Sequence, residues 1–385
     1  MNYLVRLARL VPLFAFIFAP AAVAAVPPQP QLAAKSWVLM DAATGVVLVN
    51  HEGGTRLPPA SLTKLMTAHV AALALQRGKL KESDLVPISE KAWRMGGSKM
   101  FVRVGDRIAV KDLLRGIIVQ SGNDASIALA EHMAGDERTF AALMNQEARR
   151  LGLVDTNFVN ATGWPADGHY SSALDMAELA RAIILEDPAH YSMYAEKEFV
   201  WSGIKQPNRN LLLWRDPSVD GLKTGHTEEA GYCLVASAQR DGMRLIASVF
   251  GTVSENARAV ETAKLLGYGF NFFEARTFFK KGQAVQDVAV WKGAARSVKA
   301  GVAQDFSAAL PRADSDAYQM RVVLTDGNVV APVPAGAPLG RIELVGADGK
   351  VAMQAPLIAL ETVEQGGFFR RVWEGIRLFF KGLFG

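Results

Sequence analysis

The chain has 385 residues, half of them apolar, and a formal net charge of +4. This composition excludes a disordered or fibrous protein and provides enough apolar side chains for at least two packed units. Two of the positive charges, Arg6 and Arg9, lie in the first 25 residues, and a local excess of three lies in the last 18, so the rest is close to neutral. The charge therefore gives no reason to expect a nucleic-acid partner.

Residues 1–25 predict a secretory signal peptide. Arg6 and Arg9 precede an apolar run from Leu10 to Ala19, and Ala22-Val23-Ala24 follows as a cleavage site of small residues. A first transmembrane helix is the alternative, but the run is shorter than the ~20 residues that a span needs. Cys233 is the single cysteine, so the exported chain forms no intrachain disulfide, and its apolar neighbours predict a buried strand with a core thiol.

Residues 26–275 are expected to form one unit, an antiparallel sheet packed with helices. Two β-rich runs around Ala43-Thr44-Gly45 predict a hairpin near residues 36–51, and apolar residues recur at three and four from Ser61 to about Asp187, as in helices. Three further runs between residues 221 and 253 predict a meander of strands, and a helix from about Asn256 to Phe273 closes the unit. Two early and three late strands around a helical insertion indicate one shared sheet.

Residues 276–365 predict a small all-β domain, because short alternating runs are separated by Asp-Gly, Gly-Asn and Pro turns. Residues 366–385 predict an amphipathic helix. Its apolar face would comprise Phe369, Val372, Trp373, Ile376, Phe380 and Leu383, and its polar face Arg370, Glu374, Arg377 and Lys381. An aromatic-rich helix with a basic opposite face is typical of an anchor lying in a membrane surface. The alternative is a helix docked on the protein itself.

Ser61 and Lys64 introduce the chemistry of the chain. They stand at i and i+3 in the predicted first helical turn, so their side chains share one face and can touch. A serine hydroxyl needs a base to become a nucleophile, and a lysine is such a base once burial and a nearby cation lower its pKa. Taken alone, the pair is better explained as an N-capping serine beside a surface lysine.

Two further motifs follow in the chain. Ser121-Gly122-Asn123 stands just before a predicted helix, where Asn123 or Asp124 would otherwise be read as a cap. Lys223-Thr224-Gly225 lies on or near a predicted strand, where the glycine permits a close backbone approach. Alone, Lys223-Thr224-Gly225 is a short strand that ends in a turn.

The order Ser-x-x-Lys, Ser-x-Asn, Lys-Thr-Gly resembles the motif set of penicillin-binding proteins and class A β-lactamases. The chain is most similar to the low-molecular-mass penicillin-binding proteins that act as D-alanyl-D-alanine carboxypeptidases. The resemblance extends over nearly the whole exported chain. It implies an α/β (α+β) penicillin-binding/β-lactamase-like domain, a small all-β domain and a terminal amphipathic helix. The β-lactamase pattern fits less well, since Gly122 replaces an aspartate and a Glu-x-x-x-Asn element has no convincing copy.

The resemblance implies a peptidoglycan stem peptide ending in D-Ala-D-Ala as substrate, and β-lactams as covalent inhibitors. Ser61 would be the nucleophile, Lys64 its base, and Ser121, bonded to Lys64 and Lys223, the group that passes the proton to the departing amine. Asn123 would hold the substrate amide and restrain Lys64.

The resemblance also assigns the binding of the substrate's charged end. Lys223, Thr224, Gly225 and Arg258 would surround the terminal carboxylate, and the backbone N–H groups of Ser61 and His226 would form an oxyanion hole. Only spacing supports Arg258, and the alternative is a solvated charge on a helix. The His226 side chain would line the site, and Trp164 and Arg209 could equally shape the cleft or pack.

No metal or other cofactor is implied, because the six histidines show no metal-ligand spacing. We therefore expect a carboxypeptidase exported to the periplasmic face of the inner membrane and attached by its last helix. The alternatives are a D,D-endopeptidase or weak β-lactamase on the same site, and a catalytically inactive wall-binding scaffold. The sequence leaves the preferred stem peptide, the role of the β-domain and the oligomeric state open.

Overall fold

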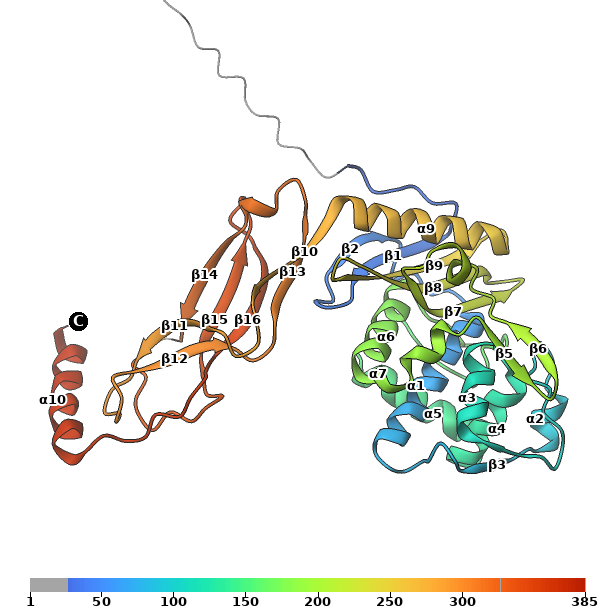
Figure 1. Cartoon of the computed structure of the whole chain (residues 1–385), viewed down its shortest axis with the longest axis horizontal. Helices are drawn as coiled ribbons and strands as arrows, with labels where there is room; N and C mark the ends of the chain where they lie inside the picture. The colour runs from blue at the N-terminus through green and yellow to red at the C-terminus, as the bar shows by residue number, and fades with distance from the viewer. Residues whose placement is uncertain (1–26, 326, 385) are drawn as a thin grey trace, which may run out of the picture.

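The computed structural model describes residues 27–325 and 327–384, so the predicted signal peptide lies outside the described residues. Figure 1 shows three parts in a row: a body of helices around a sheet, a smaller body of strands, and a terminal helix at the end farthest from the first body. The predicted fold class is confirmed, with an antiparallel sheet flanked by helices, a C-terminal all-β part and a terminal helix.

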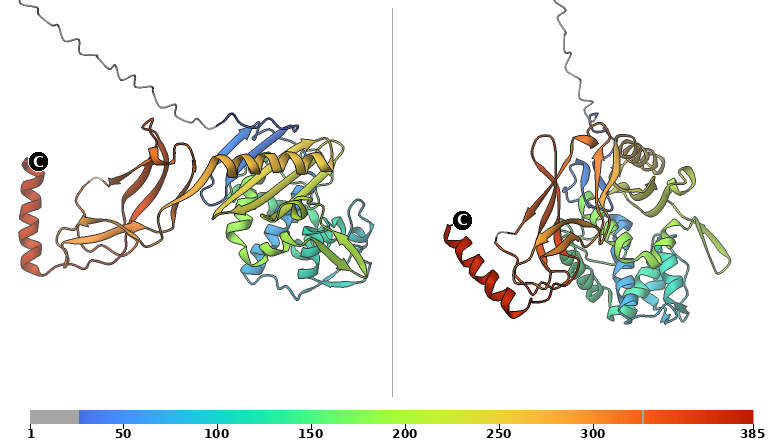
Figure 2. Two further views of the ribbon diagram at one scale, coloured as in Figure 1. Left: turned by 45° about the horizontal axis from the view of Figure 1, so that its top comes forward. Right: turned by 60° about the vertical axis from the view of Figure 1, so that its left-hand side comes forward.

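The central sheet joins the two ends of the first body. Its order is β2-β1-β9-β8-β7, and every neighbouring pair is antiparallel. The strands span β1 Ser36–Asp41, β2 Val47–His51, β7 Val219–Thr227, β8 Gly231–Arg240 and β9 Met243–Thr252. The predicted hairpin and meander are therefore both present, and β1 pairs with β9 to close one sheet. The middle strands are buried on both faces, because α9 (Glu255–Phe272) covers one face and the helical insertion covers the other (Figure 2).

The helical insertion lies between β2 and β7. Its helices are η1 Ala60–Leu62, α1 Thr63–Gln76, α2 Glu90–Arg94, α3 Val110–Ile118, α4 Asn123–Ala134, α5 Glu137–Arg150, α6 Ala173–Glu186, α7 Pro188–Tyr191, η2 Ser192–Ala195 and α8 Leu212–Arg215. Its small hairpins are β3 Leu85–Pro87 with β4 Arg107–Ala109, and β5 Glu198–Trp201 with β6 Ile204–Pro207. Ser172 caps α6 and Asp136 caps α5 by accepting a backbone N–H three residues on. In contrast, α1 and α4 have no side-chain cap, and both begin at the candidate site.

The second body begins without a linker, since β10 (Phe273–Phe279) follows α9 directly. This change from helix to strand lies next to the boundary proposed after residue 275. β10 pairs with β13 (Phe306–Pro311), and a second sheet has the order β11-β12-β16-β15-β14. Its strands are β11 Ala284–Ala289, β12 Ser297–Val302, β14 Gln319–Leu324, β15 Pro338–Val345 and β16 Val351–Ala359, with η3 Ser315–Ala317 before β14. Two small apolar clusters of its own hold this body together.

The terminal helix α10 (Phe368–Phe384) contacts the β-domain through its polar face. The Glu374 carboxylate accepts the backbone N–H of Lys292, and Arg370 donates to the carbonyls of Ala294 and Ala295. The opposite face is exposed along the described side chains: Phe368, Phe369, Val372, Trp373, Ile376, Phe379 and Phe380. The helix is thus docked on the protein, as one alternative held, but with its apolar face uncovered. Among the described residues, no helix is both long and apolar enough to cross a bilayer.

Candidate active site

Ser61 lies in η1, two residues before α1, and Lys64 lies in the first turn of α1. The Lys64 Nζ donates to Ser61 Oγ at 3.0 Å and to the Thr162 carbonyl at 2.6 Å. Lys64 is only 1 % exposed, and the residue at the N-cap position of α1 is Leu62. The capping-serine and surface-lysine alternative is therefore wrong. Ala60, just before Ser61, has a φ of 48°, a strained conformation for a residue with a side chain.

The environment of Lys64 makes it a base near neutral pH. Burial, reinforced by repulsion from Arg209, lowers the pKa of Lys64 from 10.5 to about 7, although the Asp124 carboxylate acts in the opposite direction. A neutral Lys64 presents a lone pair to the hydroxyl that it contacts, so it can take the Ser61 proton as that oxygen attacks a carbonyl.

The carbonyl that holds Lys64 belongs to a loop packed tightly against η1. A Cβ at Gly163 would lie 1.8 Å from the Ala60 carbonyl oxygen, and its φ is +81°, so only glycine fits there. The adjacent His169 bonds Thr63 at 2.8 Å, and burial together with the charge of Lys64 lowers the pKa of His169 to about 4. His169 is thus neutral at pH 7, and its partner Thr63 lies two residues after Ser61 in the chain.

Ser121 and Asn123 stand at the start of α4, and their hydrogen bonds differ from those expected. Ser121 has a φ of 65° and is buried, and its Oγ has no hydrogen-bond partner among the described residues. The expected bonds from Ser121 to Lys64 and Lys223 are absent, because Lys64 is occupied by Ser61 and Thr162 while Lys223 donates to the Thr224 carbonyl at 3.2 Å. The expected restraint of Lys64 by Asn123 is also absent.

Asn123 instead joins the site to the loop in front of it. Its Nδ2 donates to the Gly96 carbonyl at 2.8 Å and its backbone N–H to Ser98, while its buried Oδ1 has no partner among the described residues. Buried polar atoms are nearly always paired. Ser121 Oγ and Asn123 Oδ1 are therefore free to hydrogen-bond a ligand that enters beside Lys64.

Sequence reasoning missed the role of Asp124, which was considered only as a helix cap. Its carboxylate accepts the backbone N–H groups of Met100, Phe101, Val102 and Ala125 at 2.8 to 3.2 Å. The residue at the N-cap position of α4 is Gly122, so neither Asn123 nor Asp124 is the cap. Asp124 fixes the loop whose carbonyls bind Asn123. The only signal in the sequence was an acidic residue directly after the second motif.

Lys223, Thr224 and Gly225 lie inside β7, and all three are buried. Burial, with the charges of Lys64, Arg209 and Arg258, lowers the pKa of Lys223. A Cβ at Gly225 would lie 2.9 Å from the Pro59 carbonyl oxygen, so the glycine admits the segment that precedes Ser61. β7 is thereby placed directly against η1. The next residue, His226, is exposed and stacks on Tyr232 with 3.9 Å between ring centroids.

Arg258 reaches the third motif from α9. Its guanidinium donates to the carbonyls of Gly225 at 3.4 Å and Arg209 at 3.2 Å, and pairs with Glu255 at 2.7 Å. Its side chain is 4 % exposed, so the solvated-charge alternative is wrong. Arg209, which sequence reasoning left undecided, bonds Ser98 Oγ at 2.7 Å, while Trp164 is half exposed. Three cationic side chains, those of Lys223, Arg258 and Arg209, therefore converge at one end of the site.

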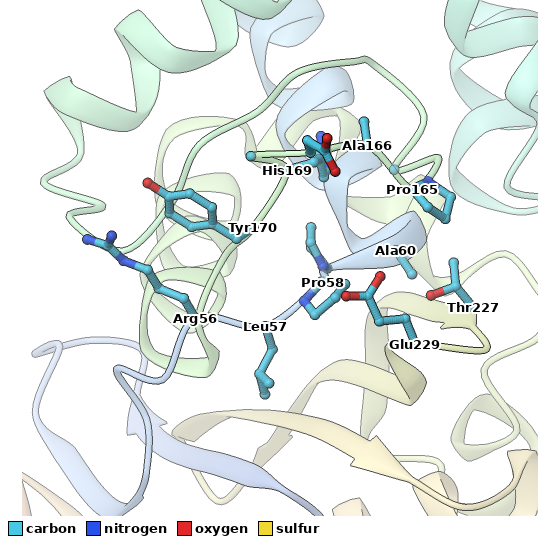
Figure 3. A pocket seen from close by; sticks show the side chains of 14 residues that line it. Arg56, Leu57, Pro58, Ala60, Pro165, Ala166, His169, Tyr170, Thr227 and Glu229 are labelled. Carbon is cyan, nitrogen blue, oxygen red and sulfur yellow. The ribbon is translucent and has the colours of Figure 1, made fainter.

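A cavity of about 510 Å³ opens beside η1. Figure 3 shows Pro58 and Ala60 on its floor, Pro165, Ala166 and His169 on one side, and Thr227 and Glu229 on the other. These residues come from the segment before Ser61, the loop after Thr162 and the region just beyond His226. The cavity is thus an extension of the site along β7, past the nucleophile.

Within the described residues, one group has the composition of a metal site: His69, Glu147 and Glu186, whose ligand atoms lie within 4.8 Å of one another. Arg150 already donates to both carboxylates at 2.6 Å. The Arg150 guanidinium therefore already supplies a positive charge between the two carboxylates. The group does not contact Ser61 or Lys223.

Two family models match the chain. Residues 22–254 match the model described as D-alanyl-D-alanine carboxypeptidase, and residues 273–365 match the C-terminal domain of penicillin-binding protein 5. The first match ends directly before α9 and the second begins at β10, so together they reach into both bodies of the structure.

Individual proteins are similar over most of their length. The D-alanyl-D-alanine carboxypeptidase DacC of Escherichia coli is 42% identical over 97% of this chain and 95% of its own. The structure of penicillin-binding protein 5 from Haemophilus influenzae covers 89% of this chain and 100% of its own, at 41% identity and a TM-score of 0.83. An ampicillin-bound penicillin-binding protein D2 from Listeria monocytogenes covers 63% of this chain and 100% of its own, at 29% identity and a TM-score of 0.59.

Proposed function

The chain belongs to the D-alanyl-D-alanine carboxypeptidase family of low-molecular-mass penicillin-binding proteins, and on that premise we propose that Ser61 forms its acyl-enzyme. The enzyme is a serine-type carboxypeptidase that removes the terminal D-alanine of peptidoglycan stem peptides. The observation that carries the assignment of the nucleophile is the 3.0 Å contact between Ser61 Oγ and a buried lysine whose pKa is about 7.

In the first half-reaction, Lys64 accepts the Ser61 proton while Oγ attacks the carbonyl of the penultimate D-alanine. The backbone N–H groups of Ser61 and His226 stabilise the oxyanion, which contributes a few kcal/mol in enzymes of this kind. The C–N bond breaks, Ser121 passes a proton to the departing amine, and D-alanine leaves. Water then hydrolyses the Ser61 ester and returns the proton. The Ser121 Oγ has no hydrogen-bond partner among the described residues, so it is available to the departing amine.

The terminal carboxylate of the substrate lies at the cationic end of the site. The Thr224 hydroxyl donates a hydrogen bond to it, and Lys223 and Arg258 supply positive charge. Asn123 Oδ1, which lacks a partner within the described part of the chain, accepts the substrate amide N–H. The cavity beside η1 then gives room to the part of the stem peptide on the acyl side of the scissile bond.

Intact mass spectrometry of the chain from residue 26, mixed with a pentapeptide ending in D-Ala-D-Ala, tests these assignments. We expect loss of one alanine from the peptide, a stable penicillin adduct on the protein, and neither event in Ser61→Ala. Labelling that persists in Ser61→Ala would remove Ser61 as the nucleophile. A penicillin adduct without alanine release would indicate that this chain cuts another bond, as an endopeptidase does.

We further propose that α10 attaches the protein to the membrane surface, on the periplasmic side after export by residues 1–25. The exposed aromatic face of α10 supports this, because so many large apolar side chains on one helix face are costly in water. Figure 1 shows α10 at the end of the molecule farthest from the sheet that carries the site. The β-domain then acts as a spacer between the bilayer and the active site.

A further inference from the structure

A second cavity, of about 530 Å³, lies where α10 meets the β-domain. Its polar and aromatic lining comprises Trp291 and Arg296 from the connection between β11 and β12, and Arg370, Trp373, Glu374 and Arg377 from α10. Backbone bonds fix the connection, because Val290 N–H donates to the Arg296 carbonyl and Trp291 N–H to the Val329 carbonyl. One wall of the cavity is therefore formed by the β-domain and the other by α10.

The single carboxylate in this lining is already engaged. Glu374 accepts the Lys292 backbone N–H and the Arg370 Nε at 3.1 Å, and the remaining Arg370 donors bond the carbonyls of Ala294 and Ala295. These two residues therefore compensate each other and hold the helix in place. They leave no unpaired carboxylate in this lining for a cationic ligand.

The other two arginines have guanidinium groups that are not bonded to a carboxylate among the described residues. Neither Arg296 nor Arg377 has an ion pair with a carboxylate in the described part of the chain, and the Arg377 guanidinium stacks over the Trp291 ring at 5.6 Å. Two guanidinium groups that face one cavity suit a phosphodiester, because each presents a planar fork of N–H donors that matches phosphate oxygens.

The position of the cavity relative to the apolar face identifies the source of the phosphate. The exposed side chains of Phe369, Trp373 and Ile376 would enter the boundary between headgroups and acyl chains, which an interfacial helix occupies to ~5–10 Å. The cavity beside the polar face of the same helix then lies among the headgroups. Trp373, which borders the cavity and is 63% exposed, is typical of residues at this level.

We propose that this cavity binds the phosphate of an acidic phospholipid headgroup between Arg296 and Arg377. The proposal rests on the membrane attachment of α10 proposed above, and it adds a preference of the attached protein for one class of lipid. A headgroup without an amine, such as phosphoglycerol, is favoured, because the single carboxylate of the lining is already paired with Arg370 and leaves no unpaired negative charge for the amine of a zwitterionic headgroup. The β-domain thereby takes part in the attachment through Arg296.

Co-sedimentation of the chain from residue 26 with two vesicle types tests the proposal: phosphatidylcholine alone, and phosphatidylcholine with phosphatidylglycerol. We expect tighter binding to the acidic vesicles and a loss of about fivefold of that preference in Arg296→Gln, as for one basic residue at an anionic surface. Arg296→Lys keeps the charge without the fork, and we expect it to lose part of the preference. Binding to phosphatidylcholine alone should be equal in all three proteins.

Lys281→Gln is the matched control, since Lys281 is an exposed cation at the opposite end of β11 and has no ion pair among the described residues. It should keep the full preference.

Equal preference in the wild type, Arg296→Gln and Arg296→Lys would overturn the headgroup site while leaving the anchor intact. Failure of the wild type to bind either vesicle would overturn the anchor as well. A saturable change in tryptophan fluorescence with millimolar inorganic phosphate and no vesicles would overturn the lipid assignment in favour of free phosphate.

Discussion

Lys64 Nζ lies 3.0 Å from Ser61 Oγ and is directed there by the Thr162 carbonyl, 2.6 Å away. The carbonyl comes from a loop 98 residues further along the chain, so the lysine is held from two sides at a buried position. A cation at the start of a helix is electrostatically unfavourable. Here that cost favours the neutral amine, which is the form that can accept a proton.

Replacement of Lys64 tests this role. Lys64→Met keeps the length of the side chain but removes the basic nitrogen, so we expect the second-order rate of acylation by a fluorescent penicillin to fall about 10³-fold, in the range typical of a lost general base. Lys64→Arg is the control for charge, since its guanidinium stays protonated, and it should be equally slow. Acylation at the normal rate in Lys64→Arg would show that the residue supplies only positive charge.

The pH dependence of acylation follows from the same amine. Because the pKa of Lys64 is about 7, the fraction of neutral lysine rises as the pH rises through that value. The acylation rate should therefore be low at pH 5, rise tenfold per pH unit below pH 7, and level off above it. Stopped-flow labelling with a fluorescent penicillin from pH 5 to 9 measures this profile. A rate that is flat below pH 7 would contradict Lys64 as the base.

Asp124 controls the loop in front of the site. Asp124→Asn replaces one of two acceptor oxygens with a donor that faces backbone N–H groups, so we expect a loss of roughly 2–4 kcal/mol in the free energy of unfolding and slower acylation. Urea denaturation and penicillin labelling measure the two effects. Asp136→Asn, which alters only the exposed cap of α5, is the control and should leave acylation unchanged.

Glu147 links α5 to α1 far from the nucleophile. Burial acts to raise its pKa, but hydrogen bonds from His69 and Arg150 outweigh burial and lower it to about 2. Its ionised form therefore stabilises the folded state above the unfolded pKa of 4.5, and this stabilisation is lost as the pH falls from there towards 2. We expect Glu147→Gln to cost about 3 kcal/mol at pH 7 in urea denaturation and much less near pH 3. An equal cost at both pH values would contradict the ionic origin.

Local patterns were sufficient to predict most of the fold. The periodic apolar residues of α1, α5, α6 and α9 and the apolar runs of β8 and β9 are visible within each segment, and the structure confirms these elements. The hairpins β3–β4 and β5–β6 were not predicted, because strands of three or four residues carry too little pattern to recognise.

The three motifs likewise predicted which segments meet, but not how their atoms are paired. The burial of Lys64 depends on Thr162, and the lowering of its pKa depends in part on Arg209, both of which are distant in sequence. Spacing also gave no information on side-chain direction, so the expected Ser121 bonds to both lysines were wrong. The function of Asp124 was hidden because it acts through the backbone of a loop that has no motif of its own.

Removal of α10 tests the proposed attachment. A chain that ends at Gln365 keeps both bodies and their apolar clusters, and loses only a helix whose contacts with the rest run through Glu374, Arg370 and neighbouring groups. We expect the shortened protein to remain in the supernatant after membrane sedimentation and to release D-alanine at the rate of the full chain. Trp373→Ser with Phe369→Ser is the matched variant, because both side chains lie on the exposed face and it should weaken sedimentation while leaving the Glu374 contact in place. Continued sedimentation of the shortened chain would place the attachment in another part of the protein.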